Sequence, residues 1–149
     1  MPSMTSEIKS LIDQMKVNKA KGQYAVYKPL LLLIVFSKVL KGEANHFDFE
    51  RIGQKLEALM EKHGWRTFSS KRAQYPFYFL ASSELWETNV SSTDLKHPDS
   101  PSKKEMENAV GKLNDRYYKF LIDNPSETEK LISYVNEKFF ATPVNLNEL

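Results

Sequence analysis

Two short segments of this sequence place aromatic rings and a proline beside cations, which is the chemistry of a binding surface. The segments are Tyr27-Lys28-Pro29 and Tyr75-Pro76-Phe77, and Lys71 and Arg72 stand just before the second. Pro29 suits the first turn of a helix, and helix starts attract anions through free N–H groups and the helix dipole. The structural alternatives are an ordinary helix start at Pro29 and a core strand at the second segment.

Residue types that perform catalysis are present but isolated. His46, His63 and His97 each stand alone, whereas a nuclease of the HNH class needs a histidine base beside a metal-binding histidine and asparagine. Acidic candidates such as Asp48 and Glu57 fall on the polar faces of expected helices, not on paired strands that would hold Mg²⁺. The five glycines form no phosphate-binding loop, and there is no cysteine for a zinc site or a thiol nucleophile. We therefore expect no catalytic residue, no metal site and no cofactor.

The composition is that of one globular domain. The length of 149 residues and the hydrophobic fraction of 41% predict a single domain over residues 1–149. The longest apolar run, residues 30–36, is far too short to span a bilayer, and the N-terminus has no signal-peptide pattern. Together with the absence of cysteine, this predicts a cytoplasmic protein with no membrane partner. The net charge of +2 is small, so a nucleic-acid partner would require locally concentrated cations.

The elements that position these residues are expected to be mostly helical. Apolar spacing and capping residues predict helices over residues 6–19, 30–40, 48–63, 103–110, 114–122 and 126–140. The helix over 30–40 is apolar almost all round and begins at Pro29, so it should be the buried centre. Ser6 is the expected N-cap of the first helix, and Ser102 and Ser126 each precede a glutamate at the capping-box spacing.

The aromatic segment is expected to form the small β part of the domain. Residues 76–80 and 85–88 are short aromatic runs, typical of a small β-hairpin or two short extended pieces. Alternation along a strand would turn Phe77 and Phe79 inward and leave Pro76 and Tyr78 at the surface. The expected fold class is therefore mainly α, a compact helical domain with a small β-hairpin or two short strands.

These motifs, in this order, resemble the sulfur-binding domains of phosphorothioate-dependent, McrA-like HNH restriction endonucleases. The first block is Tyr27-Lys28-Pro29 and the leucine run after it, where the family has His or Tyr, then Lys or Arg, then Pro and leucines. The second block runs from Gln74-Tyr75-Pro76-Phe77 to Leu85-Trp86-Glu87. The third, residues 126–140, is similar to the family's closing helix. One departure is Gly111-Lys112-Leu113, where the family often has Gly-Gly-Phe.

The resemblance implies recognition of double-stranded DNA in which sulfur replaces a non-bridging phosphate oxygen. Sulfur is a weaker hydrogen-bond acceptor than oxygen, so an apolar pocket accepts it at a smaller desolvation cost. The implied pocket residues are Tyr27, Pro29, Tyr75, Pro76 and Phe79. The implied DNA-contacting residues are Lys28, Lys71, Arg72, Gln74, Lys103, Lys104 and Lys112. Arg72 and Gln74 are also of the types that contact base edges.

The resemblance also implies a partner, a nuclease domain or protein that acts on the recognised DNA. Two other functions fit the residues. A protein-interaction domain would use an exposed Tyr75-Pro76 patch to dock a partner chain. A divergent nuclease would require a metal site that the motifs do not supply. For Lys103, Lys104 and Lys112, an ordinary solvated surface is the alternative to DNA contact.

Overall fold

The computed structural model describes residues 3–17, 19–20, 23–24, 27–63 and 72–149. In chain order its helices are α1 (Met4–Gln14), α2 (Tyr27–Leu40), α3 (Phe49–His63), α4 (Gln74–Phe79), α5 (Lys103–Met106), α6 (Asp115–Asp123) and α7 (Pro125–Phe139). Its strands are β1 (Lys19–Ala20), β2 (Gln23–Tyr24), β3 (Phe47–Asp48), β4 (Trp86–Thr88) and β5 (Val110–Leu113). The expected fold class, mainly helical with a small β part, is confirmed.

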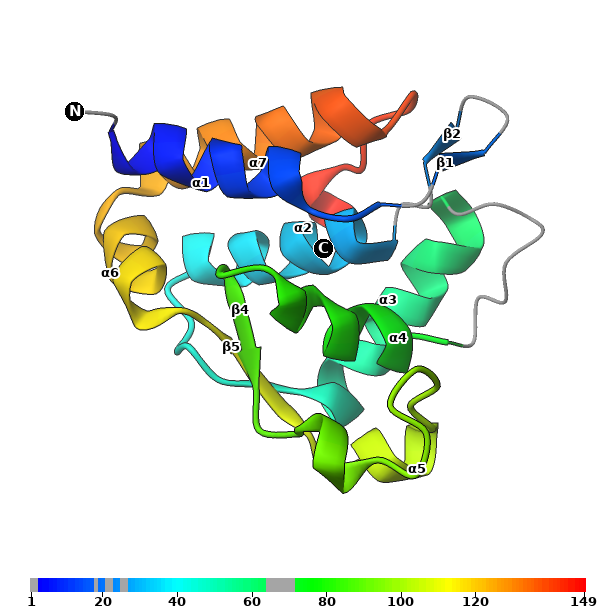
Figure 1. Cartoon of the computed structure of the whole chain (residues 1–149). Helices are drawn as coiled ribbons and strands as arrows, with labels where there is room; N and C mark the ends of the chain where they lie inside the picture. Colours follow the sequence, from blue (N-terminus) through cyan, green and yellow to red (C-terminus); the bar gives the residue numbers. More distant parts are fainter. Residues whose placement is uncertain (1–2, 18, 21–22, 25–26, 64–71) are drawn as a thin grey trace.

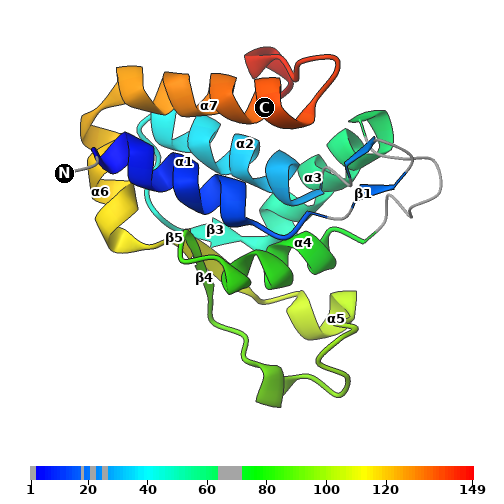
Figure 2. The ribbon, with the colours of Figure 1, turned by 45° about the horizontal axis from the view of Figure 1, so that its top comes forward.

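Helix α2 is the buried centre of the domain. Its residues from Leu30 to Phe36 are fully shielded from solvent, as expected for a helix that is apolar all round. Figure 1 shows α1 and α7 on one side of α2, with α3, α4 and the sheet on the other, and Figure 2 shows α1 and α7 from above. Within the described residues, no helix is both long and apolar enough to cross a membrane.

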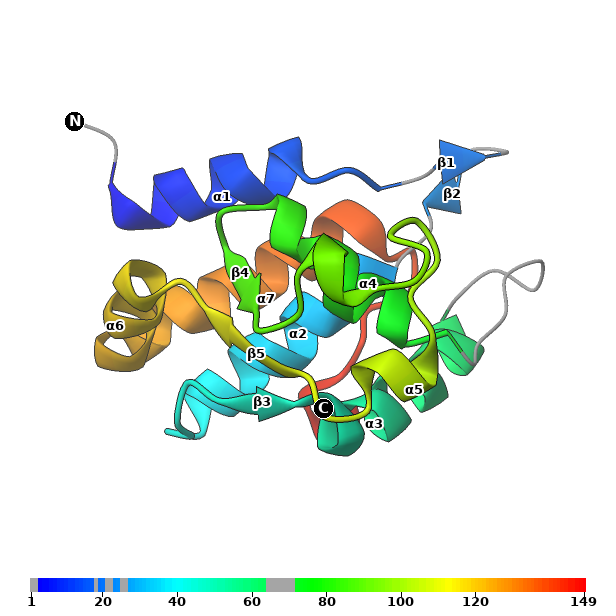
Figure 3. The same cartoon turned by 60° about the horizontal axis from the view of Figure 1, so that its bottom comes forward.

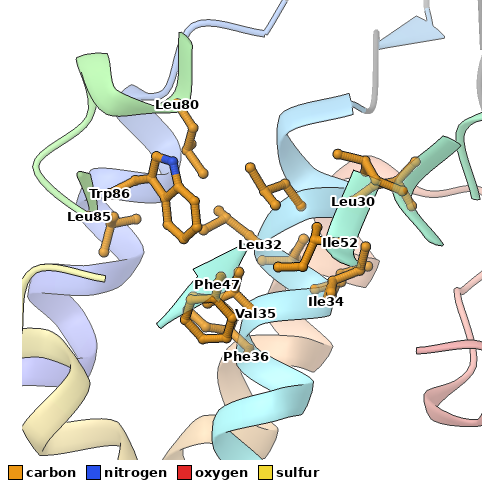
Figure 4. Close-up of a cluster of buried hydrophobic side chains, with 14 of the residues drawn as sticks. Leu30, Leu32, Ile34, Val35, Phe36, Phe47, Ile52, Leu80, Leu85 and Trp86 are labelled. Carbon is orange, nitrogen blue, oxygen red and sulfur yellow. The ribbon is translucent and has the colours of Figure 1, made fainter. Parts of the chain in front are cut away.

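A three-stranded antiparallel sheet closes the core below α2. Its strand order is β3-β5-β4, so the last strand in the chain lies in the middle. Strand β4 matches the expected extended piece over residues 85–88, whereas β3 and β5 were not expected. The helix expected over residues 103–110 ends at Met106, and the chain then pairs with two distant strands. Figure 4 shows side chains of α2 meeting Phe47, Leu85 and Trp86 in one cluster.

The aromatic segment after Arg72 is a helix, α4, and the expectation of a strand there was wrong. Tertiary packing around Phe77 favours a helix over a strand. Phe77 is fully buried and meets the rings of Phe49 and Trp86 edge-on, at centroid distances of 5.2 and 5.4 Å. Pro76 lies in the first turn of α4, where its missing N–H costs little. Helical spacing also buries Pro76, so its expected place at the surface was wrong, and it leaves Phe79 half-buried.

The helix starts agree in part with the expected capping residues. The capping box of Ser102 and Glu105 is present at the start of α5. The first helix, however, is capped by Ser3, three residues before the expected Ser6. Helix α7 begins at Pro125, which needs no N–H at that position, so the expected cap at Ser126 was wrong.

The C-terminal turn is held against the end of α3 by polar and aromatic contacts. Glu148 pairs with Lys62, lies 3.3 Å from Nε2 of His63 and accepts a hydrogen bond of 2.9 Å from the backbone of Asn145. The His63 ring packs edge-on against Phe140 at 6.0 Å. Above all, the hydrogen bond from Lys62 lowers the pKa of Glu148 from 4.5 to about 2.

We expect acid to weaken the contacts of Glu148 that hold the C-terminal turn against α3. A carboxylate with a lowered pKa stabilises the folded state above its unfolded pKa of 4.5, and that stability is lost as the pH falls toward about 2. Urea unfolding of the wild type and of Glu148→Gln should therefore differ most above pH 4.5 and converge near pH 2. Glu61→Gln, at an exposed carboxylate of α3 next to Lys62, is the control. A constant difference across this pH range would contradict the assignment.

Candidate nucleic-acid interface

The first turns of α2 and α4 lie toward the same end of the molecule, the end that also carries β1 and β2 (Figures 1 and 3). Tyr27-Lys28-Pro29 forms the first turn of α2, and Gln74-Tyr75-Pro76 forms the first turn of α4. The two helices pack against each other. The fold therefore places the two segments that the sequence singled out on helices that pack together, at one end of the molecule.

The ring of Tyr75 is held by three contacts, although it is only half-buried. The ring of Phe79, one helical turn further on, stacks on it with centroids 6.0 Å apart and planes inclined by 30°. The guanidinium carbon of Arg72 lies 5.6 Å from the ring centroid, which is cation–π range. The hydroxyl is 2.9 Å from Oγ of Ser100. This arrangement presents an aromatic surface in one orientation with a cation on it.

The other residues implied for the pocket differ in how far they are exposed to solvent. Pro29 and Pro76 are buried, and Tyr27 and Phe79 are half-buried. Tyr27 packs against the core, and burial raises the pKa of its hydroxyl. Chemically, such a surface suits a large, weakly hydrogen-bonding group better than a hydrated oxyanion.

Lys28 lies beside a second cation, Lys16, which no sequence motif had indicated. Its Nζ donates a hydrogen bond of 3.0 Å to the backbone carbonyl of Lys16, which follows α1. Lys28 is half-buried, and burial and then the charge of Lys16 lower the pKa of Lys28. Among the described residues, no carboxylate pairs with either lysine. A bound phosphate would relieve the repulsion between them.

The residues just before α4 differ in accessibility. Lys71 lies outside the described residues, and Arg72 is exposed. Gln74, one of the implied DNA-contacting residues, is the first residue of α4 and is only 7% exposed. In this structure its amide is not presented to a base edge.

Two of the remaining predicted cations already have acidic partners. Lys103 donates to Glu57 at 2.7 Å. Lys112 lies 3.1 Å from Asp115, which raises the pKa of Lys112, and it sits in β5. In all three views β5 lies toward the opposite end of α4 from its first turn. Lys104, in α5, is exposed and makes no ion pair with the described residues.

The histidines are not grouped with other possible metal ligands. The side chain of His63 is 8% exposed and contacts Glu148 of the C-terminal turn, while His46 lies 3.1 Å from Asp48. In the part of the chain that the structure describes, no three histidine or acidic side chains gather as metal ligands would.

Comparison with known proteins gives one family and several solved structures. Residues 5–148 match the family described as "ScoMcrA-like, DNA sulfur-binding domain". The sulfur binding domain of SprMcrA, complexed with phosphorothioated DNA, is 19% identical, with 97% of this chain and 91% of that chain covered and a TM-score of 0.78. The corresponding domain of ScoMcrA, also complexed with phosphorothioated DNA, is 17% identical, with coverage of 99% and 95% and a TM-score of 0.80.

A longer ScoMcrA structure contains the sulfur binding domain and an SRA domain with the same kind of DNA. It is 18% identical, and the match covers 82% of this chain and 40% of that chain, with a TM-score of 0.68. No match is found among curated proteins. At these identities the structural likeness establishes the fold, and the family match covers nearly the whole chain.

Proposed function

This chain belongs to the ScoMcrA-like DNA sulfur-binding domain family, and we propose that it binds double-stranded DNA in which sulfur replaces one non-bridging phosphate oxygen. The observation that carries the proposal is the meeting of two surfaces at one end of the molecule. One is the aromatic surface of the half-buried Tyr27, Tyr75 and Phe79 on α2 and α4. The other is the pair of Lys16 and Lys28, which no described carboxylate neutralises. The phosphorothioated DNA in both related structures supports this choice of ligand.

Sulfur and oxygen differ in hydration and in hydrogen-bond acceptor strength, so they suit different protein surfaces. A phosphate oxygen is strongly hydrated, and burying it against aromatic rings without a donor is costly. Sulfur is larger and a weaker acceptor, so it loses less by lying against the Tyr75 and Phe79 rings. One such contact is worth about 1–3 kcal/mol, which corresponds to roughly ten- to two-hundred-fold discrimination.

The cations supply the affinity that both kinds of DNA share. Lys16 and Lys28 bind the charged backbone, and Arg72 adds a contact beside the Tyr75 ring. Contacts of this kind fix the position of the protein on the duplex and make binding weaken steeply with salt. Arg72 is exposed and is of a residue type that contacts base edges, so we assign it this role as well.

On this proposal the chain is a recognition module without a catalytic step of its own. Cleavage of the recognised DNA belongs to a nuclease in the same polypeptide or in a partner protein. The longer ScoMcrA structure, in which a sulfur binding domain accompanies an SRA domain, is an example of such a modular arrangement.

The test compares three kinds of duplex: unmodified, and with a single phosphorothioate in either stereochemical configuration at phosphorus. Because the flanking preference is unknown, each kind is prepared as the same pool of flanking sequences and titrated by gel shift. We expect one stereoisomer to bind about ten- to two-hundred-fold tighter than the unmodified duplex. Equal binding of all three duplexes would exclude sulfur recognition. The absence of any salt-dependent DNA binding would favour a protein-interaction domain instead.

A further inference from the structure

The hydroxyl of Tyr75 is reached by a distant loop that has no other part in the proposed site. Oγ of Ser100 lies 2.9 Å from the Tyr75 hydroxyl, although the two residues are 25 positions apart. The backbone N–H of Ser100 donates to the carbonyl of His97 at 2.9 Å, which fixes the turn that carries the serine. Pro101, directly after it, is buried and anchors the turn to the domain.

Glu105 fastens both ends of this loop with one carboxylate. One oxygen accepts from the backbone N–H of Lys96 at 2.8 Å, and the other accepts from the backbone N–H of Ser102 at 3.1 Å. The hydroxyl of Ser102 in turn accepts from the backbone N–H of Glu105 at 3.1 Å. These hydrogen bonds, first the one from Lys96, lower the pKa of Glu105 and keep it an acceptor.

The loop between these ends has little conformational freedom. Five residues, 97–101, connect the two fastened positions, and Pro98 and Pro101 each fix one backbone angle. A half-exposed tyrosine, by contrast, has several side-chain rotamers open to it in the absence of a ligand. A hydroxyl presented by a rigid loop selects one of them before DNA arrives. Ordering the ring in advance lowers the entropy cost of binding.

We propose that Ser100 is a positioning residue for Tyr75, and that Glu105 acts through it by fixing the loop. This inference rests on the proposed function, because it concerns the ring against which the sulfur lies. The inference gives Ser100 a role in selectivity through its hydrogen bond to Tyr75. Ser100 should affect the phosphorothioate duplex and leave the unmodified duplex alone, since only the former depends on the orientation of the ring.

The test is a double-mutant cycle between Ser100→Ala and Tyr75→Phe, read as the ratio of affinities for the two duplexes. Each single variant should lower that ratio by about two- to ten-fold, the cost of ordering one side chain. The double variant should lower it no further than either single variant, because both remove the same hydrogen bond. Ser100→Thr, which retains the hydroxyl, should keep the wild-type ratio. Glu105→Gln, which keeps only one acceptor, should resemble Ser100→Ala.

Matched controls separate positioning from folding. Ser92→Ala and Glu107→Gln change exposed residues of the same region and should alter neither the ratio nor the melting temperature. A wild-type ratio in Ser100→Ala, or full additivity with Tyr75→Phe, would overturn the positioning role while leaving sulfur recognition intact. A wild-type protein without any preference for the phosphorothioate duplex would overturn the proposed function, and the positioning role with it.

Discussion

Replacing Lys28 with methionine is expected to weaken binding to phosphorothioate and unmodified duplexes alike, by about ten-fold or more. Methionine keeps the apolar stem of the half-buried side chain and removes the charge. A hydrogen bond from a charged donor is worth about 1.5–3 kcal/mol, or roughly ten- to hundred-fold in affinity. The loss is shared by both duplexes because both carry a charged backbone. Fluorescence anisotropy titrations with the two duplexes measure it.

The salt dependence of binding identifies the lost contact. If Lys28 binds a phosphate, the slope of log affinity against log salt should fall by about 0.9 for its removal. Lys41→Met is the matched control, because Lys41 is an exposed lysine at the opposite end of α2. Its slope and affinity should stay at the wild-type values. A large affinity loss in Lys28→Met with an unchanged slope would mean that the substitution acts on the fold and not on a phosphate.

The parts of the fold that could be predicted from the sequence are those in which a long run of residues all favours the same environment. The run from Leu30 to Phe36 is apolar in every direction, and α2 is accordingly the buried centre. The start of α4 shows the opposite case. Its rings favour a strand by local propensity, but Phe49, 28 positions before Phe77, and Trp86, nine positions after it, pack around Phe77 and select a helix. Strand β5 likewise depends on partners from distant segments.

Some residues of the candidate site could be predicted from their local sequence, whereas others could not. Tyr75 and Lys28 carried signals in their own neighbourhoods, and they lie in the first turns of α4 and α2. Lys16 and Ser100 carried none, because only folding brings them to Lys28 and Tyr75. Conversely, Lys112 is a cation by sequence but sits beside Asp115, a pairing that composition does not reveal.

Replacing Gly111 with alanine is expected to be among the most destabilising single-methyl changes in the chain. A Cβ at this position in β5 would lie within 2.8 Å of three atoms of the Trp86 ring, Cζ2, Cη2 and Cε2. The ring has little freedom to withdraw, because Trp86 is 1% exposed and its Nε1–H donates to the carbonyl of Phe77 at 2.8 Å. Overpacking of this kind costs about 3 kcal/mol, which lowers the melting temperature of a domain of this size by roughly 10 °C.

A double variant tests whether Trp86 is the cause. In a Trp86→Phe background the smaller ring leaves room for the added methyl, so Gly111→Ala should cost much less than it does alone. Gly53→Ala is the matched control, because its Cβ meets only the Phe49 side chain, at 3.3 Å, and it should change stability by at most about 1 kcal/mol. Equal costs of Gly111→Ala in both backgrounds would contradict the clash. Because Trp86 also holds the Phe77 carbonyl in α4, we expect surviving Gly111→Ala protein to lose selectivity for the phosphorothioate duplex together with stability.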